Sequence, residues 1–174
     1  MQYILPIFII FILLPIAIAW ISMAPWVPTK KKDIQRLIKI LELKPGEKFL
    51  EIWCWDARVS RTVASAFPQS QITGLELAYP MWIIAKIIWY FRGTKNCSIN
   101  FGDAFKQDFS HYDVVYVYGM PDKIWKKIIP KFMSEAKSWV KLYSYVFSIP
   151  EKYNKWVRTY GEEGEAKIHV LEKI

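Results

Sequence analysis

The chain has 174 residues, enough for one domain of ordinary size. Apolar residues make up 53% and charged residues 23% of it, which excludes a disordered or collagen-like chain. The formal net charge is +8, and tryptophan (9 residues) outnumbers glycine (7), although average usage would give about a dozen glycines. Cys54 and Cys97 form no Cys-x-x-Cys motif or Cys/His cluster, so we expect no metal site and a reducing compartment.

The N-terminal segment has the pattern of a membrane span. Residues 3–24 carry no charge, and a helix of this length, rising about 1.5 Å per residue, would cross a hydrocarbon core of about 30 Å. A cleaved signal peptide is the alternative, with Ala-Ile-Ala at 17–19 as its cleavage motif. Basic residues are missing before the apolar run, and three lysines follow it at 30–32. By the positive-inside rule this favours a single-pass anchor in the cell membrane, with the rest of the chain in the cytoplasm.

We therefore expect an anchor and juxtamembrane segment at 1–29 and one soluble domain at 30–174. The start of that domain is basic, with seven basic and three acidic residues from Lys30 to Lys48. Such a stretch suits the anionic inner leaflet of a membrane better than a nucleic acid. A helix is expected at 33–43, with four apolar residues on one face: Ile34, Leu37, Ile38 and Leu41.

Beyond Pro45-Gly46, short apolar strands alternate with helical patterns, which predicts an α/β fold with a parallel sheet and helices on both faces. The expected strands are 48–52, 71–75, 98–101, 114–118 and 140–147, with a sixth at 167–171. The expected helices are 58–67, 80–91 and 122–137, the last interrupted at Pro130.

Polar residues stand where these strands end. Glu51 ends the first strand, Glu76 the second, and Asp103 follows the third, while Tyr-Gly-Met-Pro at 118–121 closes the fourth. In such sheets, ligands bind beyond the carboxyl ends of the strands. One of these acids alone could be a solvated loop residue, but three at successive strand ends indicate a binding site.

This ordered set resembles the class I S-adenosylmethionine-dependent methyltransferases, which have a Rossmann-like sheet. In that family an acidic residue precedes a glycine-rich loop after the first strand, a second acid holds the ribose hydroxyls, and an Asp after the third strand contacts the adenine edge. The resemblance implies a methyltransferase with S-adenosyl-L-methionine as its cofactor. The residues that it assigns to cofactor binding are Glu51, Trp53, Cys54, Trp55, Ala57, Glu76, Leu77, Asp103 and Ala104.

A narrower resemblance is to the membrane-anchored protein-lysine methyltransferases, whose eukaryotic members modify the ATP synthase c subunit and the adenine nucleotide translocase. It is carried by the apolar anchor, by Pro-Trp-Val-Pro-Thr at 25–29 and by the motifs at 108–113 and 117–121. It implies N-methylation of a lysine in a membrane-associated protein, with Tyr118 and Pro121 beside the acceptor. A nucleic-acid substrate is disfavoured, because Tyr-Gly-Met-Pro stands where such enzymes have an Asn/Asp-Pro-Pro-aromatic motif.

The loop after the first strand departs from the family pattern. Where the family has acidic-x-Gly-x-Gly-x-Gly, this chain has Trp53, Trp55 and Ala57 at the three glycine positions. Glycine serves there because the backbone turns tightly, with positive φ, and because the cofactor approaches the main chain closely. Trp139 likewise precedes the fifth strand, where the family commonly has a turn glycine.

Two hypotheses explain these tryptophans. Either the chain is a degenerate methyltransferase fold that serves as a non-catalytic binding module, or UGA codons, which some bacterial lineages read as glycine, have been translated as tryptophan. One decoding change is simpler than three substitutions, and it would change the tally to 6 tryptophans and 10 glycines, closer to ordinary glycine usage. The codons at 53, 55 and 139 decide between the two.

Overall fold

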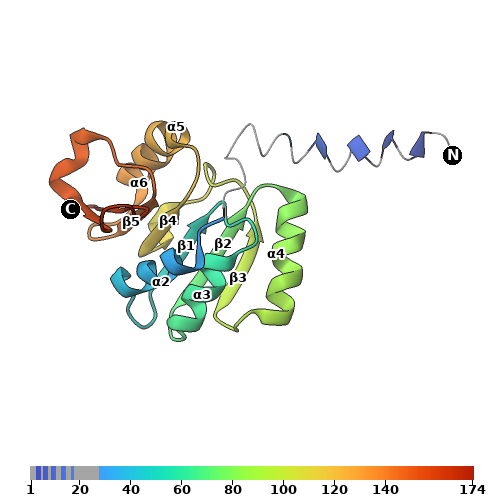
Figure 1. Ribbon diagram of the computed structural model, residues 1–174, viewed down its shortest axis with the longest axis horizontal. Helices are drawn as coiled ribbons and strands as arrows, with labels where there is room; N and C mark the ends of the chain where they lie inside the picture. The colour runs from blue at the N-terminus through green and yellow to red at the C-terminus, as the bar shows by residue number, and fades with distance from the viewer. Residues whose placement is uncertain (1–2, 5, 8, 11–12, 15–16, 18–27) are drawn as a thin grey trace.

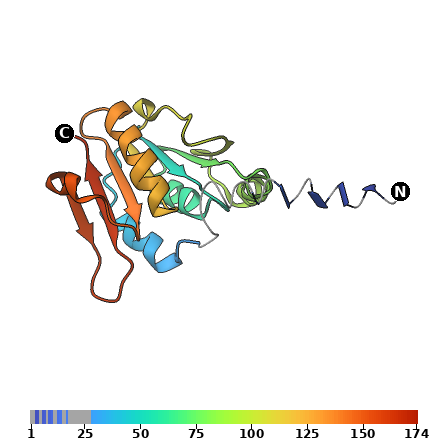
Figure 2. The same cartoon turned by 90° about the horizontal axis from the view of Figure 1, so that it is seen from above.

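The computed structural model describes residues 3–4, 6–7, 9–10, 13–14, 17 and 28–174. Residues 28–174 fold around a seven-stranded sheet with helices on both faces (Figures 1 and 2). The anchor expected at 3–24 falls largely outside the described residues. Among those described, no helix has the length and apolar character that a bilayer crossing requires.

The sheet has the strand order β3-β2-β1-β4-β5-β7-β6. The first five strands along the chain run parallel, and β7 is antiparallel to both β5 and β6. The carboxyl ends of the parallel strands therefore meet at one edge, and the strand order reverses between β1 and β4. The strands are β1 (Lys48–Ile52), β2 (Gln71–Glu76), β3 (Cys97–Phe101), β4 (Val114–Val117), β5 (Lys141–Tyr145), β6 (Val157–Tyr160) and β7 (Ile168–Glu172).

Alternation along the strands builds an apolar core on each face of the sheet. Leu50 and Val115 face one core, whereas Phe49 and Tyr116 face the other. The first core is covered by the π-helical turn η2 (Ile124–Ile128), which follows the short helix α5 (Pro121–Lys123), and by α6 (Ile129–Glu135). The second core is covered by α2 (Lys31–Ile40), α3 (Arg58–Ala66) and α4 (Tyr79–Arg92). Short 3₁₀ turns complete the connections at η1 (Phe109–His111) and η3 (Glu151–Trp156).

The interruption expected at Pro130 takes the form of a change of helix type. The π-helical turn η2 leads directly into α6, and Pro130 lies in the first turn of α6. A proline lacks the N–H that an α-helix uses, and the first turn is where that loss is tolerated. Ile128, Ile129 and Phe132 are fully buried, so the apolar face continues through the change.

A buried polar cluster fixes α2 to the sheet. Asp33 is 1% exposed, and its carboxylate accepts hydrogen bonds from the Tyr145 hydroxyl at 2.8 Å and from the Arg36 guanidinium at 2.8 Å. Just before α2, the Thr29 hydroxyl hydrogen-bonds with the hydroxyl of Tyr116 at 3.1 Å. The chain therefore enters the domain against β4 and β5.

The edge strand β6 was not predicted from the sequence. Its middle residues, Arg158 and Thr159, are both exposed, so the strand lacks the apolar alternation that reveals a half-buried strand. The strand expected at 140–147 is also shorter in the structure. Val146 has φ 71°, and this left-handed residue ends the extended conformation of β5.

Gly74 on β2 is required by a close approach of neighbouring elements. A Cβ there would lie 2.9 Å from Ser60 Oγ, 3.0 Å from Cys54 Sγ and 3.0 Å from Ile99 Cδ1. We expect Gly74→Ala to lower the free energy of unfolding by about 1–3 kcal/mol through overpacking, as measured by urea denaturation. The matched control is Thr73→Ala on the same strand, which should change stability much less; equal losses for both would contradict the steric argument.

Candidate functional site

The parallel strands bring the predicted acids to one edge of the sheet. Glu51 lies near the end of β1 and is 4% exposed, and Glu76 ends β2 and is fully buried. Asp103 is half-buried and follows β3 by two residues. Because β1, β2 and β3 are neighbours in register, the three carboxylates belong to one side of the domain, as expected from the sequence.

Glu51 joins β1 to the start of α3. One of its carboxylate oxygens accepts the Ser60 backbone N–H at 2.7 Å and the Ser60 hydroxyl at 2.5 Å. Burial raises the pKa of Glu51 from 4.5 to about 8, and the bonds from Ser60 reduce that rise. The Glu51 carboxyl therefore connects β1 to α3, and its burial disfavours the charged form. Ser60 was not among the residues predicted for the site, and its place in the first turn of α3, directly after the loop, is the signal that could have indicated it.

Glu76 holds the loop between β1 and α3 against the end of β2. Its two carboxylate oxygens accept the backbone N–H groups of Trp55 at 2.9 Å and Ala78 at 2.7 Å. Burial raises its pKa, while the backbone hydrogen bonds act in the opposite direction. Asp103 accepts the Phe105 backbone N–H at 2.9 Å, so this carboxylate also orders its own loop.

The loop itself has a repeatedly left-handed backbone. Trp53, Trp55 and Ala57 have φ values of 58°, 51° and 55°. The Cys54 N–H donates to the Leu75 carbonyl at 3.0 Å, which ties the loop to β2. Left-handed geometry costs an L-residue with a side chain about 1–2 kcal/mol, and glycine adopts it freely. The three positions that the family fills with glycine are thus the three that adopt a glycine conformation here.

The indole of Trp53 fills the space beside these acids. It is 3% exposed and packs edge-on against Phe105, with 6.0 Å between ring centroids. The same apolar cluster contains Ala78 and Ala104. Within residues 28–174 the Trp53 Nε1 atom is buried and has no hydrogen-bond partner, a loss of about 1–3 kcal/mol. The acids and the backbone fit the cofactor that the resemblance implies, but an indole at 53 does not.

Cys54 is a structural residue of the same loop. Its thiol is free and 2% exposed. Burial and the nearby carboxylates of Glu51 and Glu76 raise the pKa of this thiol, so it stays neutral. A neutral, enclosed thiol cannot serve as a nucleophile.

Tyr118 and Pro121 lie at the same edge, beyond β4. The ring of Tyr118 is edge-on to Tyr145, with centroids 4.8 Å apart, and stacks towards Phe147 at 6.3 Å. Burial raises the pKa of the Tyr118 phenol, which is therefore neutral. Pro121 begins α5, and Leu77, also assigned to the site, is half-buried after β2. These aromatic side chains make the surroundings of the β4 end apolar.

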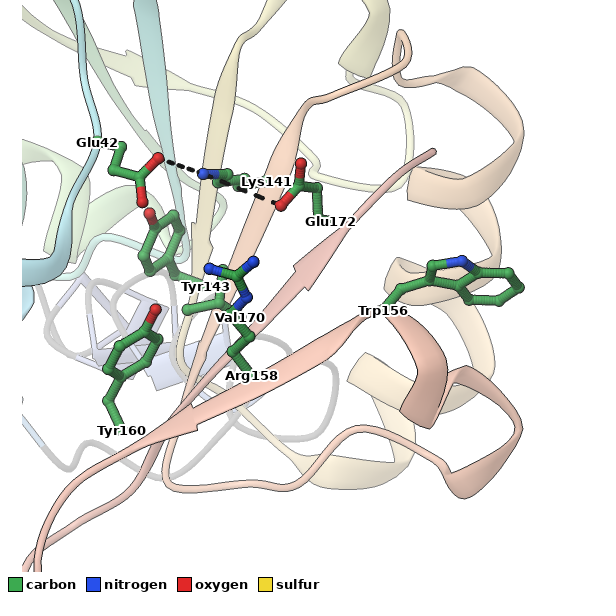
Figure 3. Close-up of a pocket in the computed structure, with 8 residues that line it drawn as sticks. All are labelled: Glu42, Lys141, Tyr143, Trp156, Arg158, Tyr160, Val170 and Glu172. Atoms are coloured by element: carbon green, nitrogen blue, oxygen red, sulfur yellow. Dashed lines mark hydrogen bonds and ion pairs between the residues drawn. The ribbon is translucent and has the colours of Figure 1, made fainter.

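A groove lined by residues such as Lys141, Tyr143 and Arg158 lies near the amino end of β5 (Figure 3). Lys141 pairs with Val114 at the amino end of β4, which places this groove away from the acids. Lys141 forms ion pairs with Glu42 and Glu172, so three of the four charged side chains that line the groove are paired with one another, and Arg158 is the fourth. The ion pairs of Lys141 therefore contribute to the stability of the fold. In the part of the chain that the structure describes, no group of three or more His, Cys, Asp or Glu side chains is arranged to bind a metal ion.

Comparisons with known proteins identify the fold. No protein-family model matches the chain. It is 25% identical over 132 residues to a protein-lysine N-methyltransferase of Saccharolobus islandicus (strain REY15A), a match that covers 75% of this chain and 81% of that protein. An RNA methyltransferase from Salinibacter ruber, solved in complex with S-adenosyl-L-homocysteine, superposes with a TM-score of 0.74 at 20% identity, over 84% of this chain and 93% of that one.

A third likeness is to an S-adenosylmethionine-dependent O-methyltransferase from Thermotoga maritima, with a TM-score of 0.66 at 13% identity, over 86% of this chain and 68% of that one. These matches confirm the class I methyltransferase fold that the strand-end acids implied, and S-adenosylmethionine is the cofactor of that fold. These three proteins are a protein-lysine methyltransferase, an RNA methyltransferase and an O-methyltransferase. The fold alone therefore does not fix the methyl acceptor.

We expect Glu51→Gln to flatten the pH dependence of stability. Since the pKa of Glu51 is about 8 in the folded protein and 4.5 in a free side chain, the folded state holds a proton that the unfolded chain releases between these values. The free energy of unfolding therefore falls as the pH rises through this window. Glutamine is neutral throughout, so the slope should become shallower in urea denaturation series from about pH 5 to about pH 8.

Glu76 also has a raised pKa, so part of the slope should persist in Glu51→Gln. The matched control is Glu163→Gln at an exposed position, which should leave the slope unchanged. An unchanged slope in Glu51→Gln would show that this carboxyl is ionised in the folded protein.

Proposed function

We propose that this chain, which has the fold of the class I S-adenosylmethionine-dependent methyltransferases, methylates a lysine side chain of a membrane-associated protein. The observation that carries the proposal is the set of three acids at the ends of β1, β2 and β3 around a left-handed loop. The lysine as acceptor rests on the relative from Saccharolobus islandicus and on the motifs at 108–113 and 117–121.

The proposed cofactor contacts follow the order of the strands. Glu76 would accept hydrogen bonds from the ribose hydroxyls, since a carboxylate has about four acceptor sites and the backbone N–H groups of residues 55 and 78 use only some of them. Asp103 would contact the adenine edge, with Leu77 and Ala104 as apolar neighbours. Glu51 and the backbone at 53–57 would face the methionine end of the cofactor, a position that requires a small residue at 53.

The cofactor supplies an electrophilic methyl group, and the chain has to align an amine with it and exclude water. A lysine ammonium has a reference pKa of about 10.4 and must lose a proton before it can react. The apolar aromatic surroundings at Tyr118 and Phe147 would lower that pKa, because burial disfavours the charged form. An essential general base is therefore not required, and Tyr118 and Pro121 serve to position the acceptor.

The membrane part of the proposal rests on residues near the start of the chain. Residues 3–24 carry no charge and lysines 30–32 follow them, the pattern of an anchor whose following domain stays in the cytoplasm. Thr29 bonds to Tyr116, which pairs directly with Glu51 across β1 and β4. An anchor at 3–24, joined to Thr29 by a short segment, would hold the binding site close to the bilayer, where confinement raises the effective concentration of membrane-protein substrates.

A second candidate is a binding module without catalysis, and the buried Trp53 favours it. An indole that occupies the cofactor space would leave the fold intact and abolish cofactor binding. The two candidates differ in one measurement, the binding of S-adenosyl-L-homocysteine to the chain with tryptophan and to its W53G/W55G/W139G form. Absence of binding in both forms would favour the module.

We expect Asp103→Ala to weaken binding of S-adenosyl-L-homocysteine by about 10-fold or more, because a charge-assisted hydrogen bond to the adenine edge is lost. Isothermal titration calorimetry on the W53G/W55G/W139G form measures the effect. Glu163→Gln is the control and should bind as its parent does. Unchanged affinity in Asp103→Ala would remove this residue from the site.

Deletion of residues 1–24 should separate anchoring from chemistry. In the W53G/W55G/W139G form, we expect the truncated chain to leave the membrane fraction and to lose methyl transfer to lysines of membrane proteins, while transfer to a soluble lysine peptide persists. The readout is incorporation of labelled methyl groups into vesicles and into the peptide. Equal losses on both substrates would show that the segment is needed for folding instead.

A further inference from the structure

Left-handed backbone is concentrated at tryptophans in this protein. Among the described residues, five residues other than glycine have φ between 51° and 71°, and three of them are Trp53, Trp55 and Trp139. The other two are Ala57, at the third glycine position of the loop, and Val146. A bulky aromatic residue is a poor choice for this conformation, because its Cβ crowds the following carbonyl.

Five of the described tryptophans fall into two groups. Trp82, Trp89 and Trp125 lie in helical segments, and their indole N–H groups donate to the carbonyls of Ile99 at 3.3 Å, Cys97 at 2.8 Å and Ser148 at 2.6 Å. By contrast, Trp53 buries an indole N–H that has no partner within 28–174, and Trp139 is 69% exposed. The first group uses its side chains in packing and hydrogen bonding, as an indole in a selected position does.

We propose that residues 53, 55 and 139 are glycine in the natural protein, encoded by UGA codons that its host reads as glycine. The proposal concerns the identity of these residues and so goes beyond the proposed function. Glycine at 53, 55 and 139 would adopt the left-handed backbone of these positions without strain. Removal of the indole at 53 opens the space beside Phe105 that this side chain fills.

The gene and the natural protein provide the direct test. We expect UGA at all three positions and UGG at 82, 89 and 125, together with glycine in the corresponding peptides of protein isolated from its host, as read by tandem mass spectrometry. UGG codons or tryptophan-containing peptides at 53, 55 or 139 would overturn the proposal.

Paired substitutions test the backbone argument without any ligand. At a left-handed position glycine is favoured over alanine, so W139G should melt about 2–4 °C above W139A, and W55G above W55A by a similar shift. At Trp82, inside α4, the order should reverse, with W82G melting below W82A, because glycine is the poorer helix former. If W139G melted below W139A, as expected for the pair at position 82, the result would contradict a requirement for glycine at 139.

Ligand binding separates this proposal from the methyltransferase function. The W53G/W55G form should bind S-adenosyl-L-homocysteine in calorimetry, and W53A/W55A at least 10-fold more weakly, because a Cβ at each position narrows the approach to the backbone. A gain in melting temperature without binding would support glycine and count against the proposed function. Binding by the chain with tryptophan would count against glycine at 53.

A separate observation concerns α4, which is predominantly apolar. Of its fourteen residues Ala85 is buried, and Lys86 and Arg92 are the charged ones. The helix lies beside the edge strand β3 (Figure 1). Its outward stripe follows the i, i+1, i+4, i+7, i+8 spacing of one helix face and consists of Ile83, Ile84, Ile87, Tyr90 and Phe91, the last two being 78% and 77% exposed.

We infer that this stripe, named the α4 stripe, lies in the interface of a lipid bilayer. At 14 residues α4 is about 21 Å long, too short to span a membrane but suited to lie in its surface. Tyr90 and Phe91 are residues of the type that populate membrane interfaces, and Arg92 and Lys95 follow them without an acid, as an anionic surface requires. The inference rests on the proposed anchor at 3–24, which would keep the helix at the bilayer.

Site-specific fluorescence on the full chain tests this contact. With an environment-sensitive label on Ile87→Cys, reconstitution into vesicles of phosphatidylcholine and phosphatidylglycerol should shift emission to the blue, and nitroxide lipids should quench it. A label on Thr159→Cys, exposed on β6, is the matched control and should do neither. Vesicle binding without a shift at 87 would overturn the α4 contact and leave the anchor standing, whereas failure to bind vesicles would overturn both. A shift in detergent that depends on protein concentration would identify a second copy as the occupant.

Discussion

The left-handed turn between β1 and α3 is the constraint on which the binding edge depends. Its backbone is held by two buried acids, Glu51 through Ser60 and Glu76 through the N–H of residue 55. Burying two carboxyls is unfavourable, which is why the pKa of each is raised, and the hydrogen bonds that they accept offset part of that cost. The turn brings the start of α3 and the ends of β1 and β2 into one rigid corner.

Because the backbone of this corner is fixed, the side chains at 53 and 55 decide what the corner can do. An indole at 53 fills the space next to Phe105 and leaves its own N–H without a partner. A residue without a side chain would leave the same backbone and acids around an open space. The same fold can therefore serve as a closed module or as a cofactor site, and the difference lies in a few atoms rather than in the topology.

The carboxyl ends and the amino ends of the parallel strands have different roles. At the carboxyl ends of the parallel strands, the acids accept hydrogen bonds from backbone N–H groups and lie beside left-handed turns. Their carboxylate oxygens can accept further hydrogen bonds from a ligand. At the amino edge Lys141 is balanced by Glu42 and Glu172 (Figure 3), so its charge serves the fold. This division follows from parallel strands, which place all their carboxyl ends, and the loops that leave them, on one side.

The sequence by itself determined the parallel sheet, because apolar runs separated by helical periodicity specify strands and helices locally. It also determined the strand-end acids and the glycine positions of the loop, since these depend on order along the chain. Only the tertiary structure decided that the Ser60 hydroxyl donates a hydrogen bond to Glu51, and that the Tyr145 hydroxyl donates one to Asp33. It also decided that the exposed strand β6 completes the sheet. These features depend on contacts between distant segments or on an edge strand without apolar alternation. Backbone dihedral angles were likewise fixed by the fold, and they separate Trp53, Trp55 and Trp139 from the tryptophans that a helix accommodates.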